Sequence, residues 1–237
     1  MGESQVPPRT WDDIWQIIDA AEKDPAFAPA IAKILAVDST HPLLTALPAT
    51  IERGLPGDPQ WKSGYYRMML GRYLIAARLG AGQVVLDSCS GLGWGTLLLS
   101  ATAAKVVAFD RSEDALHFAQ EVWSPPPLVE FRCFDALVDQ PDLHGRFDLV
   151  TAMETVEHFV KPDGVAYLRL LGQYLKPGGR IVGTTHLGET RAEADTFDRD
   201  NPYHLYMWTR GEIEETLGEG FTEVTVVRNW MFHAVKR

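Results

Sequence analysis

The sequence predicts an α/β fold in which helices cover a mostly parallel sheet. From Val84 onward, short apolar runs alternate with longer segments of helical periodicity, an order typical of parallel strands joined by helices. Strands are predicted at 84–87, 105–110, 128–134, 147–152 and 180–185. Helices are predicted at about 95–103, 112–122, 163–175 and 209–217. Two further β-rich runs, separated by a couple of residues, should pair as a closing hairpin, at 222–228 and 231–236.

Residues 1–70 precede this alternation and are predicted to form a helical cap on a domain at 71–237. Apolar residues recur at three- and four-residue steps after Thr10, which predicts an amphipathic helix there. Two more helices are expected at about 29–37 and 65–79. Either the three helices only cover one side of the sheet, or they form a lid that excludes water from a substrate cleft.

The composition narrows the classes of protein and of partner. The net charge of −10 disfavours sequence-independent binding to nucleic acid, because such binding depends on Lys and Arg side chains that neutralise the phosphates. No apolar run approaches the roughly 20 residues of a membrane span, and the first residues do not resemble a secretory signal. Cys89 and Cys133 are too few for a disulfide framework. We expect both to be small buried hydrophobes in a reducing, cytoplasmic setting.

The stretch 84–110, VVLDSCSGLGWGTLLLSATAAKVVAFD, predicts a cofactor site. Its first apolar run ends at Asp87, a turn rich in glycine follows, and a second apolar run ends at Asp110. Glycines let a ligand approach the main chain, and the N-terminus of the next helix favours an anionic group. Asp110 lies 23 positions after Asp87, close to the spacing at which an acid accepts the hydroxyls of a ribose.

Five motifs in order give the chain a resemblance to the class I S-adenosylmethionine-dependent methyltransferases, from about Tyr73 to the C-terminus. They read VLDSCSGLGWGT, VVAFDRS, VEFRCFDAL, FDLVTAMETVEHF and YLKPGGRIVGTTH. Ser88 and Ser90 stand where that family usually has glycine, and both are small enough for the turn. The resemblance implies a Rossmann-like sheet of seven strands with an antiparallel last strand, and S-adenosylmethionine as cofactor.

The same resemblance implies which residues contact the cofactor. Asp135 would face the adenine amino group, and Arg72 would bind the cofactor's carboxylate or, alternatively, be a solvated helix charge. The full set of predicted cofactor contacts is Arg72, Asp87, Ser88, Cys89, Gly91, Gly93, Asp110, Arg111, Asp135, Ala136 and Met153.

A second cluster follows the fourth predicted strand, in the sequence M-E-T-V-E-H-F. If a helical turn begins there, the spacing places Glu154, Glu157 and His158 on one face. Two neighbouring carboxylates repel each other unless a proton or a cation lies between them. Two carboxylates and an imidazole suit a divalent metal ion.

E-x-x-E-H followed by His204 resembles the metal site of small-RNA 3′-terminal 2′-O-methyltransferases, and ubiquinone-type and sugar O-methyltransferases share E-x-x-E-H. This resemblance implies that Glu154, Glu157, His158 and His204 hold Mg²⁺ or a similar ion, which would lower the pKa of a substrate hydroxyl. Two alternatives stay open. His158 or His204 could be a metal-free general base with Glu154 beside the cofactor, or the cluster could be structural.

The predicted function is therefore methyl transfer from S-adenosylmethionine, to an oxygen of a small molecule or sugar rather than to nucleic acid. N-methylation stays open. A nicotinamide-dependent oxidoreductase is disfavoured by the G-x-G-x-G spacing and by the terminal hairpin. A protein that binds the cofactor without catalysis is a third possibility. The polar segment 188–206 is long for a loop and predicts a functional insert.

Overall fold

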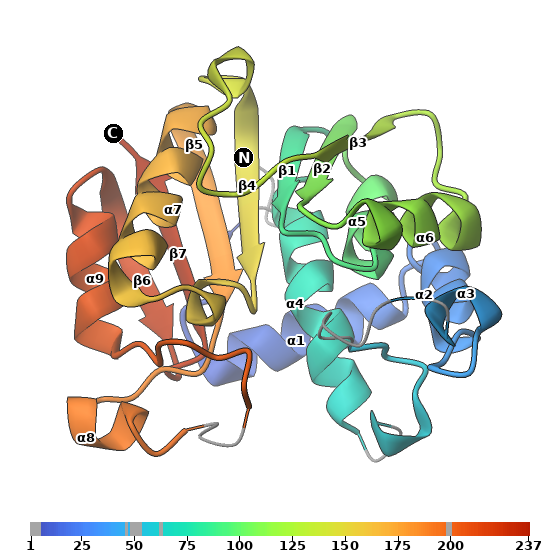
Figure 1. Cartoon of the computed structure of the whole chain (residues 1–237), viewed down its shortest axis with the longest axis horizontal. Coiled ribbons are helices and arrows are strands. Elements are labelled where there is room, and N and C mark those ends of the chain that lie inside the picture. The colour runs from blue at the N-terminus through green and yellow to red at the C-terminus, as the bar shows by residue number, and fades with distance from the viewer. Residues whose placement is uncertain (1–5, 46, 48–53, 62–63, 198–200) are drawn as a thin grey trace. The chain divides into compact units, whose positions relative to one another are not determined.

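The computed structural model describes residues 6–45, 47, 54–61, 64–197 and 201–237 (Figure 1). The chain divides into two compact units, one built on residues 12–135 and the other on residues 7–11 and 136–237. The boundary predicted near residue 70 falls inside helix α4 (Tyr65–Leu79). The proposed lid at 1–70 stays a prediction, and its positions 1–5, 46, 48–53 and 62–63 lie outside the described residues.

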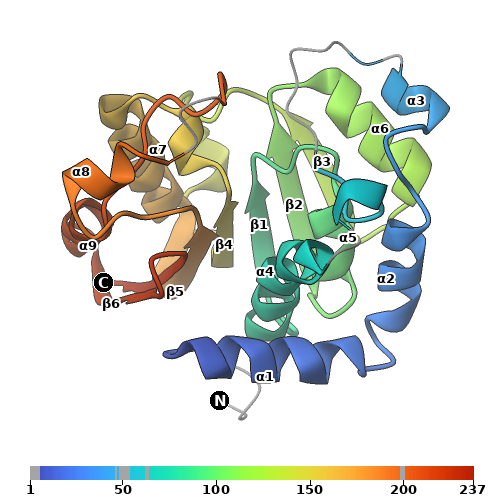
Figure 2. The same ribbon diagram turned by 90° about the horizontal axis from the view of Figure 1, so that it is seen from below.

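The first unit contains a parallel three-stranded arrangement in the order β3-β2-β1. Its strands are β1 (Val84–Ser88), β2 (Lys105–Asp110) and β3 (Val129–Cys133). Its helices are α1 (Trp11–Glu22), α2 (Ala28–Leu35), α3 (Pro42–Thr45), η2 (Pro59–Trp61), α4, α5 (Trp94–Ser100) and α6 (Glu113–Trp123). Helix α1 crosses beneath α4 (Figure 2). Ile18 of α1 packs against Gly71 of α4 so closely that a Cβ on Gly71 would lie 2.3 Å from Cδ1 of Ile18.

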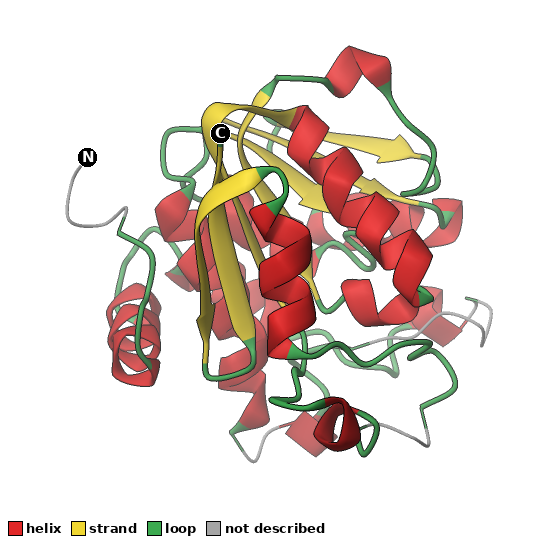
Figure 3. Ribbon diagram, turned by 90° about the vertical axis from the view of Figure 1, so that its left-hand side faces the viewer, coloured by secondary structure: helices red, strands yellow, loops and turns green. Residues whose placement is uncertain are grey.

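The second unit contains four strands in the order β4-β5-β7-β6. They are β4 (Phe147–Met153), β5 (Leu175–Thr184), β6 (Phe221–Val227) and β7 (Met231–Lys236). Strand β5 is parallel to β4, while β7 is antiparallel to both β5 and β6. The helices are η3 (Pro141–Leu143), η4 (Val156–His158), α7 (Lys161–Tyr174), α8 (Arg191–Ala194) and α9 (Arg210–Gly218). Figure 3 shows these helices in red and the strands in yellow.

The predicted fold class is confirmed: the strands are mostly parallel, helices connect them, and the last strand is antiparallel to its neighbours. Nearly continuous runs of buried residues in the central strands build the core, as parallel strands covered on both faces require. In both units the central strands bury their side chains completely, at Val85, Leu86, Val106, Ala108, Val150, Ala152, Ile181 and Val182.

Two local expectations differ from the structure. The strand predicted at 180–185 begins earlier, since β5 starts at Leu175 and includes residues 176–179, where the register to β4 shifts and Gly178 has a φ of 75°. Both cysteines were expected to be buried, and this is wrong: Cys89 is half-buried and Cys133 is exposed. Cys89 lies in the turn beyond β1, and Cys133 ends β3, which has a partner strand on one side only. No helix in the described ranges is long and apolar enough to cross a membrane.

Gly93→Ala tests how tightly the turn after β1 is packed. Gly93 has a φ of 75°, and a Cβ there would lie 2.4 Å from the Cβ of Ala119. We expect a loss of about 1–2 kcal/mol from the left-handed backbone and about 1–3 kcal/mol more from overpacking. Urea unfolding followed by circular dichroism measures the loss.

Gly82→Ala is the matched control, because Gly82 has a φ of 71° and no heavy atom would lie within 4 Å of its Cβ. Only the backbone cost applies there. Equal losses in the two variants would contradict the packing argument.

Candidate functional site

The turn after β1 has the left-handed backbone that its glycines predicted. Cys89, Gly91 and Gly93 have φ values of 50°, 52° and 75°. The amide of Ser90 donates to the carbonyl of Phe109 at 2.9 Å, which ties the turn to β2. A Cβ at Gly91 would meet no heavy atom within 4 Å, so the main chain is open to a ligand at this position.

Asp110, the last residue of β2, holds the turn to the start of α6. Its Oδ2 accepts the Gly91 amide at 2.9 Å, and its Oδ1 accepts the Ser112 amide at 2.9 Å. Ser112 in turn caps α6, because its hydroxyl accepts the Ala115 amide at 3.1 Å. Each carboxylate oxygen can accept a further hydrogen bond. The carboxylate can therefore hold this turn and accept the two hydroxyls of a ribose.

Asp87, by contrast, is fully buried and contacts hydroxyl groups of the protein. Its Oδ2 accepts the Thr96 hydroxyl at 2.6 Å and its Oδ1 accepts the Tyr73 hydroxyl at 3.3 Å. The Tyr73 ring lies against Gly95, where a Cβ would come within 2.1 Å of the ring Cζ. Asp87 thus joins β1 to α4 and α5, and these hydrogen bonds hold the end of β1 from which the turn begins. No motif in the sequence indicates that Thr96 would hydrogen-bond to Asp87.

The other predicted cofactor contacts differ in exposure. Ser88 is buried at the end of β1, and Arg72 is buried within α4, so Arg72 is not a solvated helix charge. Arg111 and Asp135 are exposed in the first unit. Ala136 and Met153 belong to the second unit, where both are buried. The assignment of all these residues to the cofactor stays a prediction.

Glu154 and Glu157 do not share one helical turn. Glu154 follows β4 with a φ of 48°, and its amide donates to the carbonyl of Thr184 at 2.8 Å. The 3₁₀ turn η4 begins only at Val156 and includes Glu157 and His158. The left-handed residue at 154 turns the chain before the helix begins, so the predicted helical face that would hold Glu154, Glu157 and His158 is not formed.

The structure brings together Glu157, His158 and His204. One possible ligand atom from each lies within 4.8 Å of the others, and Glu154 is not a member of this group. Glu157 is buried, with 1% of its surface exposed. The two imidazole rings meet edge to face, with centroids 5.0 Å apart and an angle of 81° between their planes.

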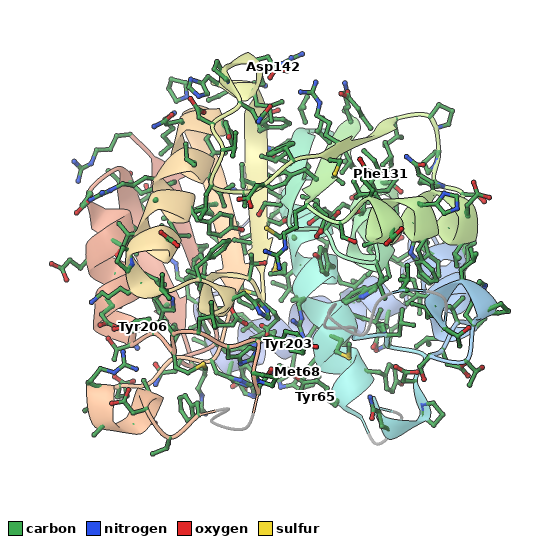
Figure 4. The ribbon with its side chains drawn as sticks, in the orientation of Figure 1. Tyr65, Met68, Phe131, Asp142, Tyr203 and Tyr206 are labelled. Atoms are coloured by element: carbon green, nitrogen blue, oxygen red, sulfur yellow. The ribbon has the colours of Figure 1, made fainter. Side chains whose placement is uncertain are left out.

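Main-chain hydrogen bonds join the segment around His204 to η4. The carbonyl of Glu157 accepts the amides of Leu205 and Tyr206 at 2.8 and 3.2 Å. Nδ1 of His158 lies 3.1 Å from the carbonyl oxygen of Tyr203. Figure 4 labels Tyr203 and Tyr206, which lie along this segment. Of the predicted insert at 188–206, positions 198–200 lie outside the described residues.

Glu212 anchors the far end of the same segment. It accepts the Tyr206 hydroxyl at 2.6 Å, Lys161 Nζ at 2.7 Å and Arg191 Nη1 at 3.3 Å. Burial alone would raise its pKa, but the hydrogen bonds from Lys161, Tyr206 and the Thr209 amide outweigh burial and lower the pKa from 4.5 to about 2. Glu212 also completes a capping box with Thr209 at the start of α9. The T-x-x-E spacing could have predicted the box, although it could not predict the contacts to Lys161 and Arg191.

Comparison with known proteins identifies the domain. Residues 85–179 match the family described as "Methyltransferase domain". The demethylmenaquinone methyltransferase of Clavibacter sepedonicus is 38% identical over 102 residues, covering 43% of this chain and 40% of the relative. The ubiquinone biosynthesis O-methyltransferase of Aromatoleum aromaticum is 32% identical over 106 residues, covering 44% of each protein. A Bacillus halodurans structure, provisionally described as a methyltransferase, is 26% identical with a TM-score of 0.59, covering 66% of this chain and 70% of that one.

These matches confirm the resemblance predicted from the sequence: the chain carries a methyltransferase domain of the class I S-adenosylmethionine-dependent kind. The alignments cover less than half the length of the two curated relatives. The chain therefore shares this domain with them. The methyl acceptors that their names indicate are known only for those relatives.

The depressed pKa of Glu212 predicts a pH-dependent contribution to stability. Its ionised form is favoured in the folded protein, so the contribution is full above about pH 4.5 and is lost as the pH falls towards about 2. We expect Glu212→Gln, which retains a capping side chain, to lower the urea midpoint at pH 6. The difference from the wild type should shrink between pH 4.5 and pH 2.5.

Glu215→Gln serves as the control, since Glu215 is an exposed glutamate on the same helix, α9. A constant difference for Glu212→Gln at all pH values would contradict the assigned role of its charge.

Proposed function

We propose that this chain is an S-adenosylmethionine-dependent methyltransferase that methylates an oxygen of a small molecule, such as a phenol or a sugar. The observation that carries the cofactor assignment is the Asp110 carboxylate, which lies at the end of β2 and is bound to the open Gly91 turn. The name of the Aromatoleum aromaticum relative, an O-methyltransferase of ubiquinone biosynthesis, supports an oxygen acceptor. The two free cysteines support a reducing, cytoplasmic setting as part of this proposal.

When bound, S-adenosylmethionine supplies an electrophilic methyl group on its sulfonium sulfur. The protein then has two tasks, to orient the two reactants and to manage the proton of the acceptor hydroxyl. Asp110 and the turn at 89–93 would perform the first task for the ribose and the adjoining part of the cofactor.

The second task falls to the group of Glu157, His158 and His204. A neutral imidazole can accept the hydroxyl proton directly. The same residues fit a divalent metal ion, because a buried carboxylate and two imidazoles converge within 4.8 Å. A bound ion would lower the pKa of the acceptor hydroxyl and so reduce the demand on a base. We favour the metal-assisted route and retain the imidazole base as its alternative.

Titration calorimetry with S-adenosylhomocysteine tests the cofactor site. Asp110→Ala removes the acceptor for both ribose hydroxyls, and a hydrogen bond to a charged group contributes about 1.5–3 kcal/mol. We therefore expect at least a roughly tenfold rise in Kd. Asp114→Ala, which removes an exposed acid from the first turn of α6, is the control and should bind as the wild type does.

A wild-type affinity in folded Asp110→Ala would contradict the cofactor assignment. Transfer of a labelled methyl group to phenols, sugars and amines then tests the acceptor. Transfer to amines alone would refute the oxygen acceptor while leaving the methyltransferase assignment intact.

A further inference from the structure

We propose that Glu157, His158 and His204 form a three-ligand site for a divalent ion of the first transition series, such as Zn²⁺, Mn²⁺ or Co²⁺, in preference to Mg²⁺. Glu154 lies outside the ligand set. Binding of the ion is independent of the proposed function, and only its role at an acceptor hydroxyl rests on that function.

The donor set determines the class of ion. Mg²⁺ prefers oxygen ligands and near-octahedral geometry, and it usually retains several waters. Two imidazoles and one carboxylate instead suit borderline transition ions, as in the two-histidine, one-carboxylate sites with open positions. The structure brings together this mixed set of three, while the second carboxylate that would favour Mg²⁺ is not part of the group.

The hydrogen bonding of His158 prepares one ligand atom. Its Nδ1 lies 3.1 Å from the carbonyl oxygen of Tyr203, and this carbonyl can only accept a hydrogen bond. Nδ1 is therefore the donor in this contact, and the lone pair of the neutral ring lies on Nε2, the nitrogen that could bind a metal. A backbone carbonyl on the far nitrogen is the usual outer partner of a metal-binding histidine.

Contacts within the second unit hold the ligands in place without an ion. Glu157 and His158 share η4, and the Glu157 carbonyl accepts two amides from the segment that follows His204. The indole of Trp208 donates to the carbonyl of Val156 at 3.2 Å, and its ring lies against Gly164 of α7. A site held by rigid supporting contacts binds an ion at little cost in reorganisation.

Three protein ligands leave at least one coordination position for another molecule. In the proposed function, that position would accept the acceptor oxygen, and the ion would stabilise it as an oxyanion. The hydroxyl proton would pass to solvent or to a nearby base. The class of acceptor that fits is a hydroxyl that can ionise while bound to a metal, such as a phenol or the hydroxyl of a vicinal diol.

The experiment is a titration of EDTA-treated, dialysed full-length protein with Co²⁺, followed through the visible absorption bands of the bound ion and by calorimetry. We expect one Co²⁺ per chain, displacement by Zn²⁺ at similar concentrations, and no displacement by millimolar Mg²⁺. Glu157→Gln and His204→Ala should each weaken binding at least tenfold. Glu154→Gln should bind as the wild type does.

His144→Ala controls for surface binding, since His144 is an exposed histidine paired with Asp139, and it should have no effect. Thermal unfolding shows which variants are folded. Three results would overturn the proposal: no Co²⁺ binding by protein that binds S-adenosylhomocysteine, competition by Mg²⁺ equal to that by Zn²⁺, or equal losses in Glu154→Gln and Glu157→Gln.

Calorimetry with S-adenosylhomocysteine in EDTA separates this proposal from the proposed function. Cofactor binding and methyl transfer without any metal binding would refute the ion and favour His158 or His204 as a base. Metal binding without cofactor binding would refute the methyltransferase proposal and leave the ion site standing.

Discussion

The turn after β1 in the first unit depends on the carboxylate of Asp110. Because this residue ends a buried strand, its position is fixed by the parallel pairing of β2 with β1 and β3. From there it accepts one amide from the turn after β1 and one from the start of α6. A left-handed turn has few hydrogen bonds of its own. The carboxylate therefore gives the turn a defined shape, and that shape leaves the main chain at Gly91 open.

The second unit uses a different construction. The side chains of its candidate site, Glu157, His158 and His204, come from the short 3₁₀ turn η4 and from a segment more than forty residues later in the chain. Main-chain hydrogen bonds join the two, because the carbonyl of Glu157 accepts the amides of Leu205 and Tyr206. Glu212 then holds the end of that segment by accepting hydrogen bonds from Tyr206 and Lys161. Glu157, whose carbonyl makes these contacts, is itself buried.

Local features of the fold could be predicted from the sequence, because they follow from local patterns. The strands end within a residue or two of their predicted positions, and Gly91 and Gly93 adopt the left-handed backbone that glycine in such a turn favours. Features set by contacts distant in sequence could not be predicted. Glu154 was expected on the same face as Glu157, but its amide is bound to Thr184 of β5, a partner thirty positions away. Cys133 was expected to be buried because its segment was predicted to be a core strand, yet among the described residues β3 pairs with a strand on one side only.

The left-handed backbone of Glu154 suggests why the two acids have different roles. A non-glycine residue in this conformation costs about 1–2 kcal/mol, so the surrounding structure must impose it. Here the bond from its amide to Thr184 fixes the residue at the end of β4, and the turn that carries Glu157 and His158 begins afterwards. A regular helix starting at Glu154 would have placed both carboxylates on one face, where their repulsion would require an oxygen-binding ion or a proton. The strained residue separates the two carboxylates. Glu157 is then grouped with two imidazoles, and this mixed set of donors suits other metal ions than a pair of carboxylates would.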